Sequence, residues 1–178
     1  MTHAFEAAAP IELLTADAAR AGLADLGDVL RACVEGGGGV GFVLPFSQAE
    51  AETFWASKLE GVERHERYLL VARLDGRIVA TVMLELAQQP NGLHRAEVAK
   101  LMVHPDARGR GLSRKLLEAL EALARSLGRS LLVLDTSTGE LAETIYPRCG
   151  YEKVGVIPGY ALFPDGRMGA TTVFCKQL

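Results

Sequence analysis

The sequence predicts a mixed α/β fold, in which a mostly antiparallel sheet contains a central parallel strand-helix-strand crossover and carries flanking helices. Residues 68–74 and 78–87 are rich in apolar and β-branched side chains, and Asp75-Gly76 between them favours a tight hairpin turn. Later in the chain, an amphipathic pattern over 111–127 leads into the apolar run Leu131–Leu134. That combination is typical of a helix followed by a strand buried on both faces.

Length and composition predict one domain spanning residues 1–178. A chain of 178 residues with 49% hydrophobic residues can bury a core without disulfides or a structural metal. Its three cysteines form no CxxC pair, and we expect no metal site and a reducing, cytoplasmic setting. The net charge of −3 disfavours a nucleic-acid partner, and no apolar stretch is long enough to predict a membrane span. Oligomeric state is not encoded in these patterns.

The first 66 residues are predicted to be helical. Apolar residues at helical spacing indicate a helix over 15–35, with Thr15 or Asp17 as its cap. A second helix is expected over 47–62, where Ser47 and Glu50 have the spacing of a capping box. The glycine run between the two helices predicts a flexible turn.

The rest of the chain is predicted to alternate strands and helices. A third antiparallel strand is expected over 97–103, and the helix that follows it should end at Gly128. A right-handed crossover then joins this strand to a parallel neighbour. The remaining predicted elements are a helix over 140–149 and two strands over 151–156 and 171–176.

The segment 103–113 has the composition of an anion-binding turn. Gly109, Gly111 and Ser113 let the backbone approach a ligand, and the first N–H groups of the following helix have no intrahelical acceptor. Further positive charge comes from Arg108, Arg110 and Arg114. A solvated basic turn before a helix is the alternative interpretation. The spacing matches neither a GxxxxGK nor a GxGxxG phosphate loop.

Two motifs in this order resemble the GNAT acetyltransferase superfamily. The first is Val103-x-Pro105, then Arg108-Gly109-x-Gly111 and a leucine-rich helix; the second is the A-x-x-x-Y-x-x-x-G-Y pattern of 142–151. Ser113 stands where the family usually has Gly or Ala, and Gly139 where many members have Asn. The resemblance implies a GNAT-like fold with acetyl-CoA as cosubstrate, in which residues 67–178 form the cofactor-binding core and residues 1–66 the acceptor side.

The same resemblance implies which residues contact acetyl-CoA. Backbone groups of one strand would bind the pantetheine arm and the thioester carbonyl, and the following turn would hold the pyrophosphate. The implied set is Leu101, Met102, Val103, Arg108, Gly109, Arg110, Gly111, Leu112, Ser113 and Thr136.

A narrower resemblance extends over most of the chain. Residues 90–98, 100–103, 134–136, 158–160 and 164–167 are similar to the tabtoxin-resistance acetyltransferases. This similarity implies transfer of acetyl to the amine of a small amino-acid-like molecule, with tabtoxinine-β-lactam as one such acceptor. A protein N-terminal or lysine acetyltransferase and a non-catalytic acyl-CoA sensor are the alternatives.

Two carboxylates are candidates for accepting a proton from an attacking amine. Asp135 is a charge at the end of an otherwise apolar parallel strand, where ligand crevices form in open α/β sheets. Its alternative role is to cap the turn through Thr136 to Thr138. The narrower resemblance pairs Asp135 with Glu97 as an acid/base pair. The alternative role of Glu97 is an ion pair with Arg95 or another basic residue.

Tyr146 occupies the family position for a phenol near the departing CoA sulfur, where it could hydrogen-bond to or protonate the thiolate. The alternative interpretation is a core tyrosine packed beside the crossover.

Overall fold

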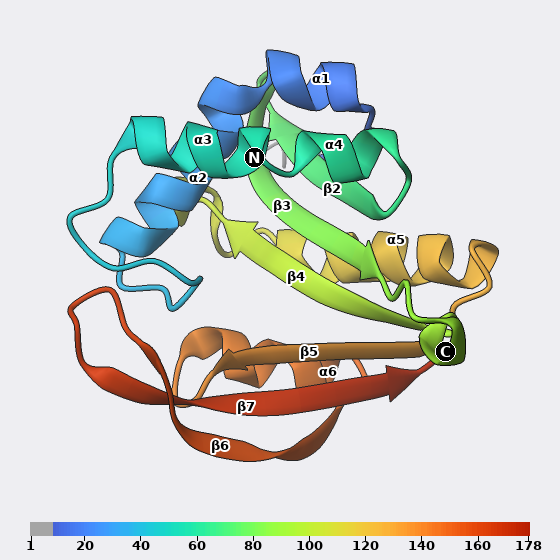
Figure 1. Cartoon of the computed structure of the whole chain (residues 1–178). Coiled ribbons are helices and arrows are strands. Elements are labelled where there is room, and N and C mark those ends of the chain that lie inside the picture. Colours follow the sequence, from blue (N-terminus) through green and yellow to red (C-terminus); the bar gives the residue numbers. More distant parts are fainter. Residues whose placement is uncertain (1–8) are drawn as a thin grey trace, which may run out of the picture.

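The computed structural model describes residues 9–178, which contain a seven-stranded sheet in the order β1-β2-β3-β4-β5-β7-β6 (Figure 1). β4 and β5 are parallel, and each other pair of neighbouring strands is antiparallel. The mixed, mostly antiparallel sheet that the sequence predicts is therefore confirmed. The strands are β1 (Ile11–Leu14), β2 (Arg67–Leu74), β3 (Arg77–Leu86), β4 (Arg95–Val103), β5 (Leu131–Ser137), β6 (Glu152–Leu162) and β7 (Met168–Gln177).

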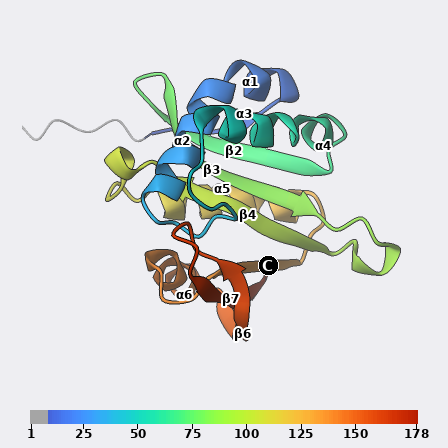
Figure 2. The ribbon, with the colours of Figure 1, turned by 60° about the vertical axis from the view of Figure 1, so that its left-hand side comes forward.

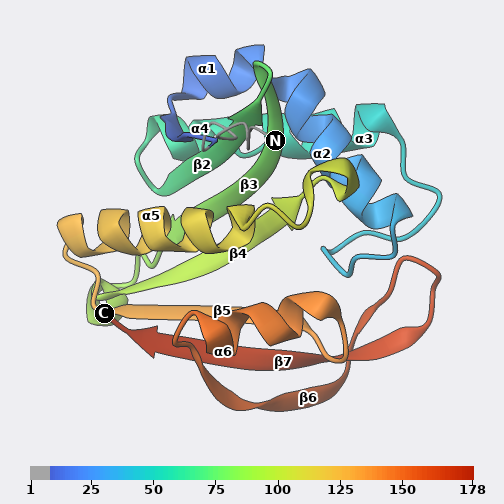
Figure 3. The same ribbon diagram turned by 180° about the vertical axis from the view of Figure 1, so that it is seen from behind.

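Helices cover both faces of the sheet. α1 to α4 lie together over one face of its first half, as Figure 2 shows from the side, and α5 and α6 lie on the opposite face (Figure 3). No helix within residues 9–178 is long and apolar enough to cross a membrane. The helices are α1 (Ala16–Ala21), α2 (Leu23–Glu35), α3 (Gln48–Ala56), α4 (Leu59–Glu63), α5 (Leu112–Ser126) and α6 (Ile145–Arg148).

The N-terminal segment differs from the helical prediction. β1 precedes the helices and pairs with β2, and its four residues are too few to show a strand period in the sequence. The predicted helix over 15–35 is divided at Gly22, and the one over 47–62 is divided at residues 57–58. The Thr15 cap and the capping box at the start of α3 are both confirmed.

The C-terminal segment contains less helix and more strand than the sequence predicts. The helix expected over 140–149 is a 3-10 turn, Leu141–Thr144, followed by the single turn of α6. β6 and β7 extend well beyond the ranges predicted for them and form one long antiparallel hairpin. Its register shifts twice along β6, which weakens the strand period in the sequence.

A bulge in β4 changes which side chains face each layer. Before it, Val98 packs on the side of α5, whereas after it Met102 packs against the helices of the opposite face. Lys100, at the bulge, has a positive φ of 52°. The buried Thr81 hydroxyl donates a hydrogen bond to the Lys100 carbonyl at 2.9 Å, which holds the irregular backbone in place.

The two parallel strands remain paired over a short length only. β4 and β5 are in register from Arg95–Leu131 to Glu97–Val133, after which they diverge (Figure 1). Within the described part of the chain, the edge of β4 that faces β5 has no strand partner beyond Glu97. Its backbone groups are available to a ligand because the neighbouring strand no longer takes them.

Candidate active site

A cavity of about 770 Å³ occupies the region where β4 and β5 separate. The start of α5, the connection between α2 and α3, and the turn of the β6–β7 hairpin complete its walls. Most of the residues that the sequence singles out line it. These are Glu97, Leu101, Met102, Val103, Arg108, Gly109, Gly111, Leu112, Ser113, Asp135, Thr136 and Tyr146. The structure therefore brings both sets of candidates, for catalysis and for cofactor binding, into one cavity.

The turn into α5 has the geometry of an anion-binding site. Gly109 and Gly111 have φ values of 78° and 70°, and nothing lies within 4 Å of a Cβ built on either residue. Gly111 is the N-cap of α5 and supplies no side-chain hydrogen bond to the first turn. The leading N–H groups are thus open at the positive end of a 15-residue helix.

The three arginines of this turn differ in their positions. The Arg108 Nε donates a hydrogen bond to the Val103 carbonyl at 3.4 Å, and Arg108 lines the cavity. Arg114 also lines the cavity but forms an exposed ion pair with Glu118. Arg110 is exposed and does not line the cavity. Among the residues predicted to bind the cofactor, its contact has the least support from the geometry.

The candidate carboxylates come from the two diverging strands. The parallel register places Glu97 beside Val133, two residues before Asp135, so both carboxylates face the same side of the sheet. Burial raises the pKa of Glu97, and the nearby charges of Glu85 and Asp135 raise it further. A carboxylate with a raised pKa is a stronger base than an ordinary one.

The alternative roles of these carboxylates are not observed. No ion pair of Glu97 with Arg95 occurs among the described residues. The Asp135 carboxylate accepts a hydrogen bond from the Thr171 hydroxyl at 2.7 Å, on the adjacent β7, and none from the turn that follows it. This contact fixes the Asp135 carboxylate at the wall of the cavity.

Tyr146 is a core residue that also borders the cavity, and its role at the CoA sulfur stays a prediction. Its ring packs against Tyr151 and Phe174 at centroid distances of 5.7 and 5.6 Å, so it belongs to the core. Tyr146 also lines the cavity, and its hydroxyl makes no hydrogen bond within residues 9–178. Burial raises the pKa of Tyr146 far above its usual value, with Asp135 adding to the shift, so the phenol is protonated and able to donate.

Sequence reasoning missed the connection between α2 and α3 as a wall of the site. The Ser137 hydroxyl donates to the Gly39 carbonyl at 3.4 Å, and the Leu44 N–H donates to the Pro164 carbonyl at 2.8 Å. A Cβ on Gly39 would lie only 2.0 Å from Ser137 Oγ, so glycine is required there. The glycine run indicates that another segment approaches this backbone closely, but the sequence does not show which segment it is.

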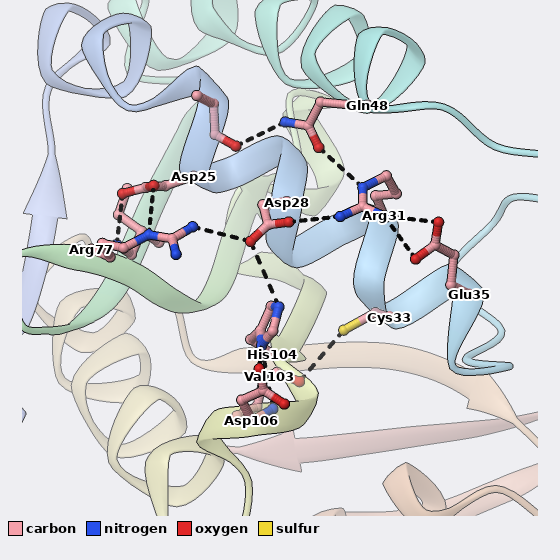
Figure 4. A network of polar contacts seen from close by, with 12 residues as sticks. Asp25, Asp28, Arg31, Cys33, Glu35, Gln48, Arg77, Val103, His104 and Asp106 are labelled. Carbon is pink, nitrogen blue, oxygen red and sulfur yellow. Dashed lines mark hydrogen bonds and ion pairs between the residues drawn. The ribbon is translucent and has the colours of Figure 1, made fainter.

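A polar network on the α2 side supports the turn before α5 (Figure 4). The Asp28 carboxylate lies 2.9 Å from Arg31, 3.2 Å from Arg77 and 3.6 Å from His104. Cys33 adds a weak contact from its thiol to the Val103 carbonyl at 3.5 Å. These contacts join α2 and β3 to the residue that begins the anion-binding turn.

Comparisons with known proteins agree with this geometry. The sequence profile described as "Acetyltransferase (GNAT) family" matches residues 41–151. An uncharacterized N-acetyltransferase from the hisH-hisA intergenic region of Azospirillum brasilense is 37% identical over 115 residues, which are 64% of this chain and 67% of that protein.

Solved structures share the fold at low sequence identity. A ribosomal-protein-alanine N-acetyltransferase from Brucella melitensis superposes with a TM-score of 0.78 at 23% identity, covering 95% of this chain and 99% of the other. A phosphinothricin acetyltransferase from Sinorhizobium meliloti in complex with AcCoA gives 0.74 at 19% identity, covering 96% and 89%. With its profile match and its parallel strands diverging at an open helix start, the chain belongs to the GNAT acetyltransferase family and is an N-acetyltransferase.

Proposed function

We propose that the protein transfers acetyl from acetyl-CoA to the amine of a small amino-acid-like molecule, with tabtoxinine-β-lactam as the first acceptor to test. One observation carries the proposal. A single cavity joins the open start of α5 to the carboxylates of Glu97 and Asp135 and to the Tyr146 hydroxyl. Donor and acceptor can therefore be held together in a ternary complex.

The cofactor side of the cavity suits an extended polyanion. The N–H groups around Gly109 to Ser113 would hold the pyrophosphate, with Arg108 adding charge, while Leu112 anchors the turn in the core. Leu101 to Val103 would offer backbone groups to the pantetheine arm because β5 has turned away from them. Thr136, on the opposite strand, would contact the same arm.

The chemistry needs one proton acceptor and one proton donor. The free amine attacks the thioester carbonyl, a C–N bond forms, and the C–S bond then breaks. Glu97 or Asp135 takes the proton that the nitrogen loses, directly or through a water. The Tyr146 hydroxyl donates to the departing sulfur, which leaves as a thiol.

The shape of the acceptor side favours a small substrate over a peptide. The Leu44–Pro164 hydrogen bond and the Ser137–Gly39 contact join the α2–α3 connection to the C-terminal strands. These bridges hold the connection against the acceptor side of the cavity, which favours a compact acceptor over an extended peptide. The experiment distinguishes this proposal from acetylation of peptides and from acetyl-CoA binding without catalysis.

The test is acetyl-CoA-dependent thiol release by the purified protein. We expect release with tabtoxinine-β-lactam or another small α-amino acid and none with peptides. Release with peptides alone would replace the proposed acceptor class. Acetyl-CoA binding without release for any amine would instead support the sensor.

A further inference from the structure

Lys100 places a positive charge in the wall of the cavity. Its Nζ donates a hydrogen bond to the Val40 carbonyl at 2.9 Å and lies 5.3 Å from the ring centroid of Phe54 and 5.8 Å from that of Phe42. Within the described part of the chain, no carboxylate lies within 4.0 Å of it. Among the described residues, the ammonium therefore has carbonyl and ring partners but no carboxylate in direct contact.

Such a charge is costly to hold without an anion. Burial lowers the pKa of Lys100 because a buried ammonium loses hydration, and the charge of Lys58 adds to the effect. The more distant charges of Glu85, Asp135 and Glu97 act in the opposite direction, and the pKa is still lowered overall. The side chain is nonetheless held in place by structure on all sides. The β4 bulge fixes its backbone at positive φ, and the aromatic rings flank its end.

Opposite charges occupy the same cavity. Glu97 lies three residues before Lys100 on β4, and Asp135 lies on the neighbouring strand. The proposed function assigns these carboxylates to the acceptor's amine. A molecule that carries an amine and a carboxylate would match both signs at once.

We propose that Lys100 binds the carboxylate of the acceptor and thereby selects amino acids over plain amines. The inference rests on the proposed function and names its substrate class more closely. Lys100 is a specificity residue in this view, and the Val40 contact holds it ready for the anion. Binding the carboxylate supplies the direct ion-pair partner that Lys100 lacks among the described residues.

A purely structural role makes a different prediction. If Lys100 only tethers the α2–α3 connection through Val40, its loss would disturb every acceptor equally. A carboxylate-binding role instead predicts a loss confined to acceptors that carry the carboxylate. The ratio of kcat/KM for an amino acid to that for its α-carboxamide separates the two roles.

The experiment compares L-amino acids with their α-carboxamides by thiol release. The wild-type protein should prefer the acid by about tenfold or more, and Lys100→Met should reduce that preference to within about twofold. Lys100→Arg should retain most of it. The control is Lys58→Met, because Lys58 contacts the same Phe54 ring at 5.0 Å but does not line the cavity. Removing its charge raises the pKa of Lys100, so this variant should keep the ratio or increase it, and should not lower it.

A binding measurement keeps the test independent of turnover. The CoA-bound protein is titrated calorimetrically with N-acetyl-L-methionine and with its amide. If the wild-type protein binds the acid more tightly than the amide and Lys100→Met loses this difference, the proposal is supported. This holds even if no amine is acetylated, because a lack of acetylation would refute only the proposed function. Equal binding of acid and amide by the wild-type protein, no binding of either, or an equal loss of both in Lys100→Met would overturn the proposal for Lys100.

Discussion

At the scale of single residues, the contribution of the Tyr146 hydroxyl can be tested separately from the packing of its ring. Tyr146→Phe keeps the contacts with Tyr151 and Phe174 and removes only the proton donor. We expect kcat to fall by roughly 100-fold, as for loss of a general acid, with acetyl-CoA affinity unchanged. Steady-state kinetics and calorimetric titration with CoA measure the two quantities.

The neighbouring tyrosine is the matched control. Among residues 9–178, the buried Tyr151 hydroxyl has no partner at hydrogen-bond distance, and Tyr151 does not line the cavity. Tyr151→Phe should leave both kcat and thermal stability unchanged or slightly raise stability, because a buried unpaired hydroxyl is costly. An equal loss of rate in the two variants would assign Tyr146 to packing alone.

The pKa of Glu97 makes a prediction about pH. As the proton acceptor, Glu97 must be ionised, so activity is lost as pH falls through its raised pKa. Glu85→Gln removes a negative charge that raises this pKa, and the acidic limb of the kcat/KM profile should move to lower pH. Glu97→Gln should abolish that limb and lower kcat/KM by roughly 100-fold.

An exposed carboxylate away from the cavity controls for a general charge effect. Glu60 pairs with Arg64 on the surface of α4, and Glu60→Gln should leave the profile unmoved. If the pH profile of kcat/KM keeps its acidic limb in Glu97→Gln, Glu97 is not the base, and Asp135 becomes the candidate.

At the scale of elements, α5 is tied to β7 by a buried ion pair. Glu121 and Lys176 lie 2.7 Å apart with side chains only 9% and 19% exposed. Lys176→Met leaves the carboxylate buried and unpaired, and should lower the free energy of unfolding by about 3 kcal/mol. Glu118→Gln breaks an exposed pair on the same helix and should cost less than about 1 kcal/mol. Similar urea-denaturation midpoints for the two variants would contradict this ranking.

The same scale shows which elements a sequence can predict. α5 was predicted to within a residue or two because its apolar stripe and its glycine boundaries agree. β1 was missed because four residues cannot establish a period, and its strand state depends on pairing with β2. The helix predicted at 140–149 is wrong in part, because a 3-10 turn forms at Leu141–Thr144, where the Glu143 carboxylate accepts hydrogen bonds from the local Gly139 N–H and from the distant Thr172 hydroxyl of β7.

At the scale of the whole molecule, the Asp28 network links the helical layer to the anion-binding turn (Figure 4). Asp28→Ala removes the shared acceptor of Arg31, Arg77 and His104, and should lower the free energy of unfolding by about 2 kcal/mol. Because His104 begins the turn, the KM for acetyl-CoA should rise more than kcat falls. The exposed Asp17–Arg20 pair provides the control, and Asp17→Ala should leave KM unchanged.

The candidate site as a whole could be predicted only in part. The turn at Gly109 to Ser113 is one continuous segment, so its spacing is visible in the sequence. Lys100, Ser137 and the α2–α3 connection meet only after folding, across separations of 60 to 98 residues. No local pattern encodes such contacts, since they depend on how far β4 and β5 diverge.

The β4 bulge also has a consequence for how this strand tolerates change in length. It acts as a phase shift, since even-numbered residues such as Val98 face α5 before it, and odd-numbered ones such as Leu101 do so after it. Deleting one residue at the bulge would restore regular alternation and leave Val98 and Met102 in their present layers, because β4 has one extra residue there opposite β3. A single-residue deletion elsewhere in β4 would instead exchange the two faces on one side of it, so this strand tolerates a lost residue at the bulge and not outside it.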